Sequence, residues 1–77
     1  MTTTKNTHTE ALELMLERLD YFMDAAKAED KIYESAQNGK EEGSEQWRSI
    51  GRDRLGIQAK YGSYVNLRKI ATDALSA

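Results

Sequence analysis

The residues of this sequence whose chemistry suits a ligand lie mostly in its second half. They combine basic and aromatic side chains: Trp47, Arg54, Tyr61, Tyr64, Asn66, Arg68 and Lys69, joined by Tyr21, Phe22 and Lys27 from the first half. A guanidinium binds phosphate in a bidentate manner, and aromatic faces stack on nucleobases for about 1–3 kcal/mol per base. This mixture predicts a site for a small anionic aromatic ligand. The predicted binding residues are Arg68, Arg54, Tyr64, Lys69, Tyr21 and Lys27.

The same residues also have a structural interpretation. Aromatic and branched residues at helical spacing usually belong to a core, which we expect for Trp47, Ile57 and Tyr61. Arg54 and Arg68 suit an ion pair with an acidic residue on the first helix of another copy as well as they suit a ligand. Arginine can reach out of an apolar seam along its aliphatic stem, so both interpretations stay open.

Catalytic and metal chemistry has little support in the sequence. His8 is the only histidine and there is no cysteine, so neither a general base with a positioned partner nor a thiolate metal site is indicated. The carboxylates Glu13, Glu17, Asp20 and Asp24 are spaced like a solvated helix face. We therefore expect a protein that is not an enzyme, with no cofactor and no metal.

Two helices must position the binding residues. Residues 10–37 contain no glycine or proline and are rich in strong helix formers, and Asn38-Gly39 predicts a helix end with Gly39 in the left-handed conformation. Ser44 suits the N-cap of a second helix that runs to about Leu75. Since the connection is short, the helices must be antiparallel. We predict an all-α fold, an antiparallel two-helix hairpin over residues 7–77, after a disordered polar tail at residues 1–6.

The first helix has more apolar surface than a hairpin can cover. Its main stripe is Leu12, Met15, Leu16, Leu19, Phe22, Met23, Ala26 and Tyr33. A second strip lies roughly opposite, at Leu14, Tyr21, Ala25, Ala28, Ile32 and Ala36. Exposed apolar surface costs about 25 cal/mol per Å², so we expect a homo-oligomer that forms a larger helical bundle.

The second helix mixes a core stripe with glycines. The stripe is Trp47, Ile50, Arg54, Ile57, Tyr61, Tyr64, Val65, Arg68, Thr72 and Leu75. Gly51, Gly56 and Gly62 each cost about 1 kcal/mol relative to alanine in a helix. The usual compensation is the close approach of another backbone, a local break, or contact with a ligand.

Charge is distributed unevenly along the chain. Residues 1–46 carry five basic and eleven acidic groups, whereas residues 47–77 carry six basic and two acidic groups. The net charge of −2 argues against a duplex nucleic acid partner. No apolar run approaches the length of a membrane span and no signal-peptide pattern is present, so we expect no membrane partner and a cytoplasmic location.

About the last thirty residues resemble the helical-hairpin module of phage anti-CBASS and anti-Thoeris proteins, which sequester cyclic nucleotide signals. The matching positions are Trp47-x-x-Ile50-Gly51, Gly62, Tyr64-Val65 and Leu67-Arg68, although Ser63 separates Gly62 from the aromatic residue here. The resemblance implies a non-enzymatic oligomer, phage-encoded, that binds cyclic di- or trinucleotides at subunit interfaces. Arg68 matches the family's arginine near the end of that helix.

A second function class remains open on the residues alone. A small inhibitor or adaptor, anti-defence or anti-CRISPR-like, would dock on a host protein through the strip from Leu14 to Ile32. That strip cannot serve a partner if copies of this chain bury it.

Overall fold

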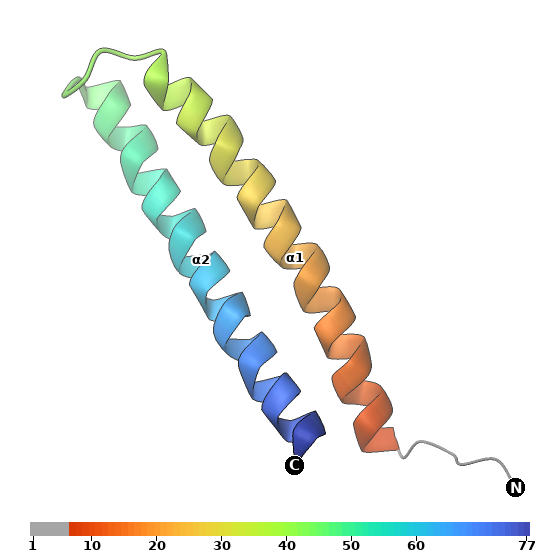
Figure 1. The fold of residues 1–77 in the computed structure, drawn as a ribbon. Coiled ribbons are helices and arrows are strands. Elements are labelled where there is room, and N and C mark those ends of the chain that lie inside the picture. The colour runs from red at the N-terminus through yellow and green to blue at the C-terminus, as the bar shows by residue number, and fades with distance from the viewer. Residues whose placement is uncertain (1–6) are drawn as a thin grey trace, which may run out of the picture.

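Two long helices make up the part of the chain that the structure describes, residues 7–77. In this computed structural model α1 spans Thr7–Asn38 and α2 spans Glu45–Ser76. They run antiparallel, with the loop at one end and both free ends at the other (Figure 1). This confirms the all-α two-helix hairpin; assembly into a larger bundle stays a prediction. The tail predicted at residues 1–6 lies outside the described residues.

The connection between the helices is tight, and one of its predicted details is wrong. α1 ends at Asn38, but Gly39 does not adopt a positive φ: its N–H bonds back to the carbonyl groups of Ser35 and Ala36. The positive φ, 84°, belongs to Gly43. The N–H of Ser44 donates to the carbonyl of Glu41, which closes a turn whose third residue is Gly43. A positive φ at that position is the type II geometry that glycine favours.

Ser44 begins α2 as predicted. Its backbone is extended, and its hydroxyl oxygen accepts a hydrogen bond from the N–H of Trp47 at 3.1 Å. That contact satisfies one of the backbone donors that a helix N-terminus leaves without an intrahelical partner.

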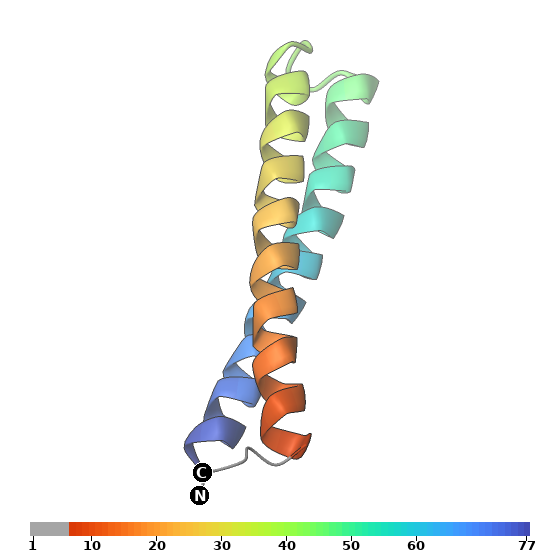
Figure 2. The same cartoon turned by 90° about the vertical axis from the view of Figure 1, so that its right-hand side faces the viewer.

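The helices pack along one narrow seam with heptad spacing. Its α1 positions are Thr9, Leu12, Leu16, Leu19, Met23, Ala26, Asp30, Tyr33 and Gln37. Its α2 positions are Trp47, Ile50, Arg54, Ile57, Tyr61, Tyr64, Arg68, Ala71 and Leu75. Figure 2 shows α2 crossing from one side of α1 to the other along its length, as helices with a 3.5-residue seam do.

The seam is narrower than the predicted stripes. Met15, Phe22, Val65 and Thr72 were expected in the core but are exposed, whereas Ala71, which was not expected there, is almost fully buried. A single neighbouring helix covers only the two seam positions of each heptad, so the apolar residues beside them stay in contact with water.

The three glycines of α2 do not break the helix, which is continuous from Glu45 to Ser76. Only Gly51 is close to a neighbour: an added Cβ would lie 3.0 Å from Nε2 of Gln37. At Gly56 and Gly62 an added Cβ would meet nothing within 4 Å. Within residues 7–77, neither helix has a segment apolar enough to span a bilayer.

Candidate functional site

The seam divides the hairpin into two sides with different chemistry. On α1, Asp20, Lys27 and Glu34 lie seven residues apart along one edge of the seam, and we call this the Lys27 side. The other edge carries Phe22 and Glu29, and we call this the Phe22 side. Residues seven apart in a helix differ by only about 20° in direction, so each row keeps to its own side.

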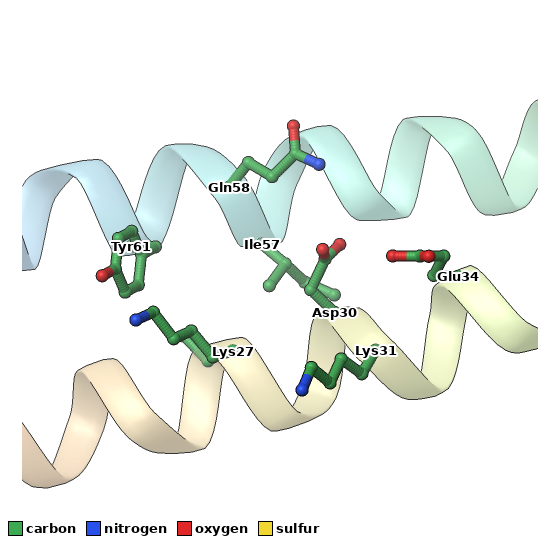
Figure 3. Close-up of a pocket in the computed structure, with 8 residues that line it drawn as sticks. Lys27, Asp30, Lys31, Glu34, Ile57, Gln58 and Tyr61 are labelled. Carbon is green, nitrogen blue, oxygen red and sulfur yellow. The ribbon is translucent and has the colours of Figure 1, made fainter.

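The Lys27 side holds a shallow pocket midway along the hairpin, with a volume of about 270 Å³ (Figure 3). Both helices contribute to it. Its lining residues are Ala26, Lys27, Asp30, Lys31, Glu34, Ile57, Gln58 and Tyr61. Apolar side chains form its floor at the seam, and charged and polar side chains form its rim.

Two lysines on successive turns of α1 give the pocket its positive charge. Lys27 and Lys31 make no ion pair with any residue that the structure describes. The Nζ atom of Lys27 lies 5.4 Å from the ring centroid of Tyr61, and Figure 3 shows this amino group directed toward that ring. A cation over an aromatic face is attracted by the ring quadrupole, so Tyr61 holds Lys27 at the edge of the pocket.

The two acidic residues of the pocket are held by Arg54. Its Nε and Nη2 donate to Oδ1 and Oδ2 of Asp30 at 3.0 and 3.3 Å, and Nη2 also donates to Oε2 of Glu34 at 3.3 Å. Nη1 donates to Oε1 of Gln37 at 3.0 Å, and Nε2 of Gln37 donates to the carbonyl of Trp47 at 3.2 Å. The hydrogen bonds from Arg54 lower the pKa of Asp30 below its usual value, and Asp30 raises the pKa of Arg54.

This network gives Arg54 a structural role. All three guanidinium nitrogens bond to α1 of the same chain, so Arg54 ties the two helices together, and its contact with a ligand stays a prediction. It pairs with an acidic residue of the first helix, within one chain. Arg54 carries one positive charge against the two carboxylates of Asp30 and Glu34, so with Lys27 and Lys31 the pocket has a net charge of +1.

Arg68 lies on the same side of the seam, farther toward the free ends. Its Nε donates to Oδ1 of Asp20 at 2.8 Å, and half of its side chain remains exposed. Arg68 follows Tyr61 by seven residues, which is about 10 Å along the helix axis. Lys69 is exposed beside it.

The remaining predicted residues lie apart from this pocket. Tyr21 meets Phe22 edge to face, with ring centroids 5.6 Å apart, and Phe22 stacks on Tyr64 at 5.8 Å. This aromatic cluster lies on the Phe22 side. The structure therefore brings Lys27 together with Tyr61, with Arg68 about two turns away, but not with Tyr21 or Tyr64.

Sequence reasoning missed Lys31 and Gln58 as lining residues and treated Tyr61 as core. The signal that could have found Lys31 is its spacing of four residues from Lys27, which places both on one helix face. Which residues of α2 lie opposite them depends on the register of the seam, which the spacing does not contain. Among residues 7–77 no group of three or more histidine, aspartate or glutamate side chains is placed to hold a metal ion.

Comparison of the chain with protein-family models, curated proteins and solved structures found no match. The likeness of its second half to the cyclic-nucleotide-sequestering proteins stays a prediction.

Proposed function

We propose that this chain is a non-catalytic binding protein that associates with copies of itself and captures a small anionic aromatic ligand. The resemblance of its second half makes a cyclic di- or trinucleotide the ligand class to test first. In a phage, such a protein would sequester a cyclic nucleotide immune signal in the host cytoplasm.

The observation that supports this proposal is the pocket on the Lys27 side. Lys27 and Lys31, which pair with no acidic residue that the structure describes, line the pocket over an apolar floor, and the ammonium group of Lys27 stands beside the ring of Tyr61. Ligand pockets commonly combine an apolar lining with a few converging polar groups. Ammonium groups suit a phosphate, and the exposed part of Tyr61 suits a base.

A second basic position favours a ligand with more than one phosphate. Arg68 lies about 10 Å beyond Tyr61 on the same side. Asp20 accepts only from Nε of Arg68, so the two terminal nitrogens of Arg68 have no hydrogen bond to break with any residue from 7 to 77. A ligand that spans the distance between Lys31 and Arg68 contacts both basic positions, whereas a mononucleotide reaches one.

The test is thermal unfolding of the chain with a panel of cyclic dinucleotides, cyclic trinucleotides, mononucleotides and inorganic phosphate. We expect a cyclic oligonucleotide to raise Tm because a ligand that binds only the folded state stabilises it. Lys27→Gln combined with Lys31→Gln should abolish the shift, and Arg68→Ala should reduce it.

The matched control is Lys40→Gln combined with Arg52→Gln, which removes the same charge from two exposed basic residues outside the lining of this pocket. That variant should keep the full shift. The proposal is wrong if no member of the panel raises Tm at millimolar concentration. It is also wrong if the control loses the shift as completely as the pocket variant.

A second candidate is a protein-binding inhibitor or adaptor. The observation that favours it is the outer surface of α1, where Tyr21 and Ile32 are 69% and 68% exposed. Solution mass combined with capture of a defined host protein separates the two functions, because a strip buried between copies of this chain is closed to any other protein.

A further inference from the structure

A single hairpin leaves many of its large apolar side chains in water. Only four hydrophobic residues among those described are buried, namely Leu19, Ala26, Ile57 and Ala71. Nine large ones are exposed: Leu14, Met15, Tyr21, Phe22, Ile32, Leu55, Val65, Leu67 and Ile70. Two of the four buried residues are alanines, so the seam alone is a thin core for a chain of this length.

Four of these nine side chains, Met15, Phe22, Leu67 and Ile70, lie on the Phe22 side. Glu29 and Lys60 form an ion pair there, with Nζ of Lys60 3.7 Å from Oε2 of Glu29. Glu29 on α1 and Lys60 on α2 therefore lie on the same side of the seam. Phe22 precedes Glu29 by seven residues, and Leu67 follows Lys60 by seven. Phe22 and Leu67, together with apolar residues three, four or seven positions away, form one patch near the free ends of both helices. Its residues are Met15, Phe22, Ala25, Leu67, Ile70 and Ala74.

We propose that a second copy of this chain docks on the Phe22 side, patch against patch, to form a four-helix bundle. A 32-residue helix is about 48 Å long, and two helices packed 8–10 Å apart present a face about 18–20 Å wide. Contact along the whole face buries roughly 900 Å² of each copy, close to the ~800 Å² per partner of a stable interface. Because both copies offer the same patch, a two-fold axis matches apolar surface with apolar surface.

The distribution of charge selects this side over the other. The α1 surface on the Lys27 side carries a run of carboxylates near the free end, at Glu10, Glu13, Glu17 and Asp24, besides Asp20, which pairs with Arg68. Two copies placed there would bring like charges together, which is unfavourable. The Phe22 side lacks such a run, and the glutamate at its centre, Glu29, already has its lysine partner.

The inference deepens the self-association in the proposed function and does not depend on the ligand. With the Phe22 side covered, the lysine pocket of each copy faces away from the contact and stays open. Gly56, whose surroundings are open in one hairpin, also lies toward the covered side, where a glycine lets another backbone approach closely.

The experiment compares Leu67→Glu with Leu55→Glu by sedimentation velocity over a dilution series. Both change one exposed leucine of α2 to glutamate; Leu67, 45% exposed, lies in the patch, and Leu55, 66% exposed, lies one turn before Gln58 on the Lys27 side. We expect the natural chain and Leu55→Glu to sediment with at least twice the mass of one chain, 8.7 kDa. Leu67→Glu should sediment with the mass of one chain.

Cross-linking keeps the test independent of whether Leu67→Glu folds. The natural sequence has no cysteine, so Leu67→Cys and Leu55→Cys each supply one unique thiol. A short bis-maleimide should link two copies through Leu67→Cys and not through Leu55→Cys. The inference is overturned if the natural chain sediments as one chain at high concentration, if Leu67→Glu keeps the oligomer mass, or if Leu55→Cys cross-links as well as Leu67→Cys.

The ligand-induced rise in Tm, measured on Leu67→Glu, separates this inference from the ligand proposal. A rise that persists in a single-chain form supports capture by one hairpin. A natural chain that forms the oligomer but shows no rise with any ligand contradicts the ligand proposal and leaves the interface standing.

Discussion

Replacing Gly62 with alanine should stabilise the hairpin. Gly62 lies within α2 with helical backbone, and an added Cβ would meet nothing within 4 Å. Glycine is about 0.8–1.0 kcal/mol less favourable than alanine inside a helix, so Gly62→Ala should raise the free energy of unfolding by about that amount. For a chain of this size, this corresponds to a rise in Tm of about 4–8 °C.

Gly51→Ala is the matched comparison, because it makes the same change three turns earlier in the same helix. There the new Cβ would lie 3.0 Å from Nε2 of Gln37, whose amide joins the carbonyl of Trp47 to the guanidinium of Arg54. Moving that amide weakens both hydrogen bonds, which offsets the gain in helix propensity. We therefore expect Gly51→Ala to raise Tm by less than Gly62→Ala, or to lower it.

Thermal unfolding followed by circular dichroism, at one protein concentration for all variants, measures both changes. Equal rises for the two variants would show that the contact at Gln37 has no energetic consequence. A fall in Tm for Gly62→Ala would refute the reasoning more seriously, since it would mean that the surface around Gly62 is occupied in the folded protein.

Two further predictions concern the start of α2 and the ion pair in the seam. Ser44→Ala should lower the free energy of unfolding by about 1 kcal/mol in urea denaturation, because the N–H of Trp47 loses its acceptor; an unchanged urea midpoint would contradict the cap. Since Arg54 lowers the pKa of Asp30, this carboxylate stabilises the fold above the unfolded pKa of about 3.9, and the contribution is lost as pH falls through the lower folded pKa. Asp30→Asn should therefore lose less stability than the natural chain between pH 5 and pH 3, and equal losses would show that Asp30 contributes nothing.

The sequence by itself determined the elements of this fold. The helices and their ends follow from local chemistry, because each signal affects the backbone only within a few residues. Residues 10–37 contain no glycine or proline, the Asn38-Gly39 pair ends the first helix, and the hydroxyl of Ser44 caps the second. The exception is Gly43, which takes the positive φ predicted for Gly39. Both glycines lie in the same short loop, and which one takes that conformation depends on how the chain must enter the second helix.

Only the tertiary structure decided how the functional side chains combine. Arg54 meets Asp30 across 24 residues, and Lys27 meets Tyr61 across the same seam, because the register of the two helices places them opposite each other. That register is set by the packing of the whole seam and by the turn at Gly43, and no local pattern contains it. The register and packing of the helices also decide on which side of the seam an exposed residue lies. The reason is that each helix covers one stripe of its neighbour, and the position of that stripe sets the two sides.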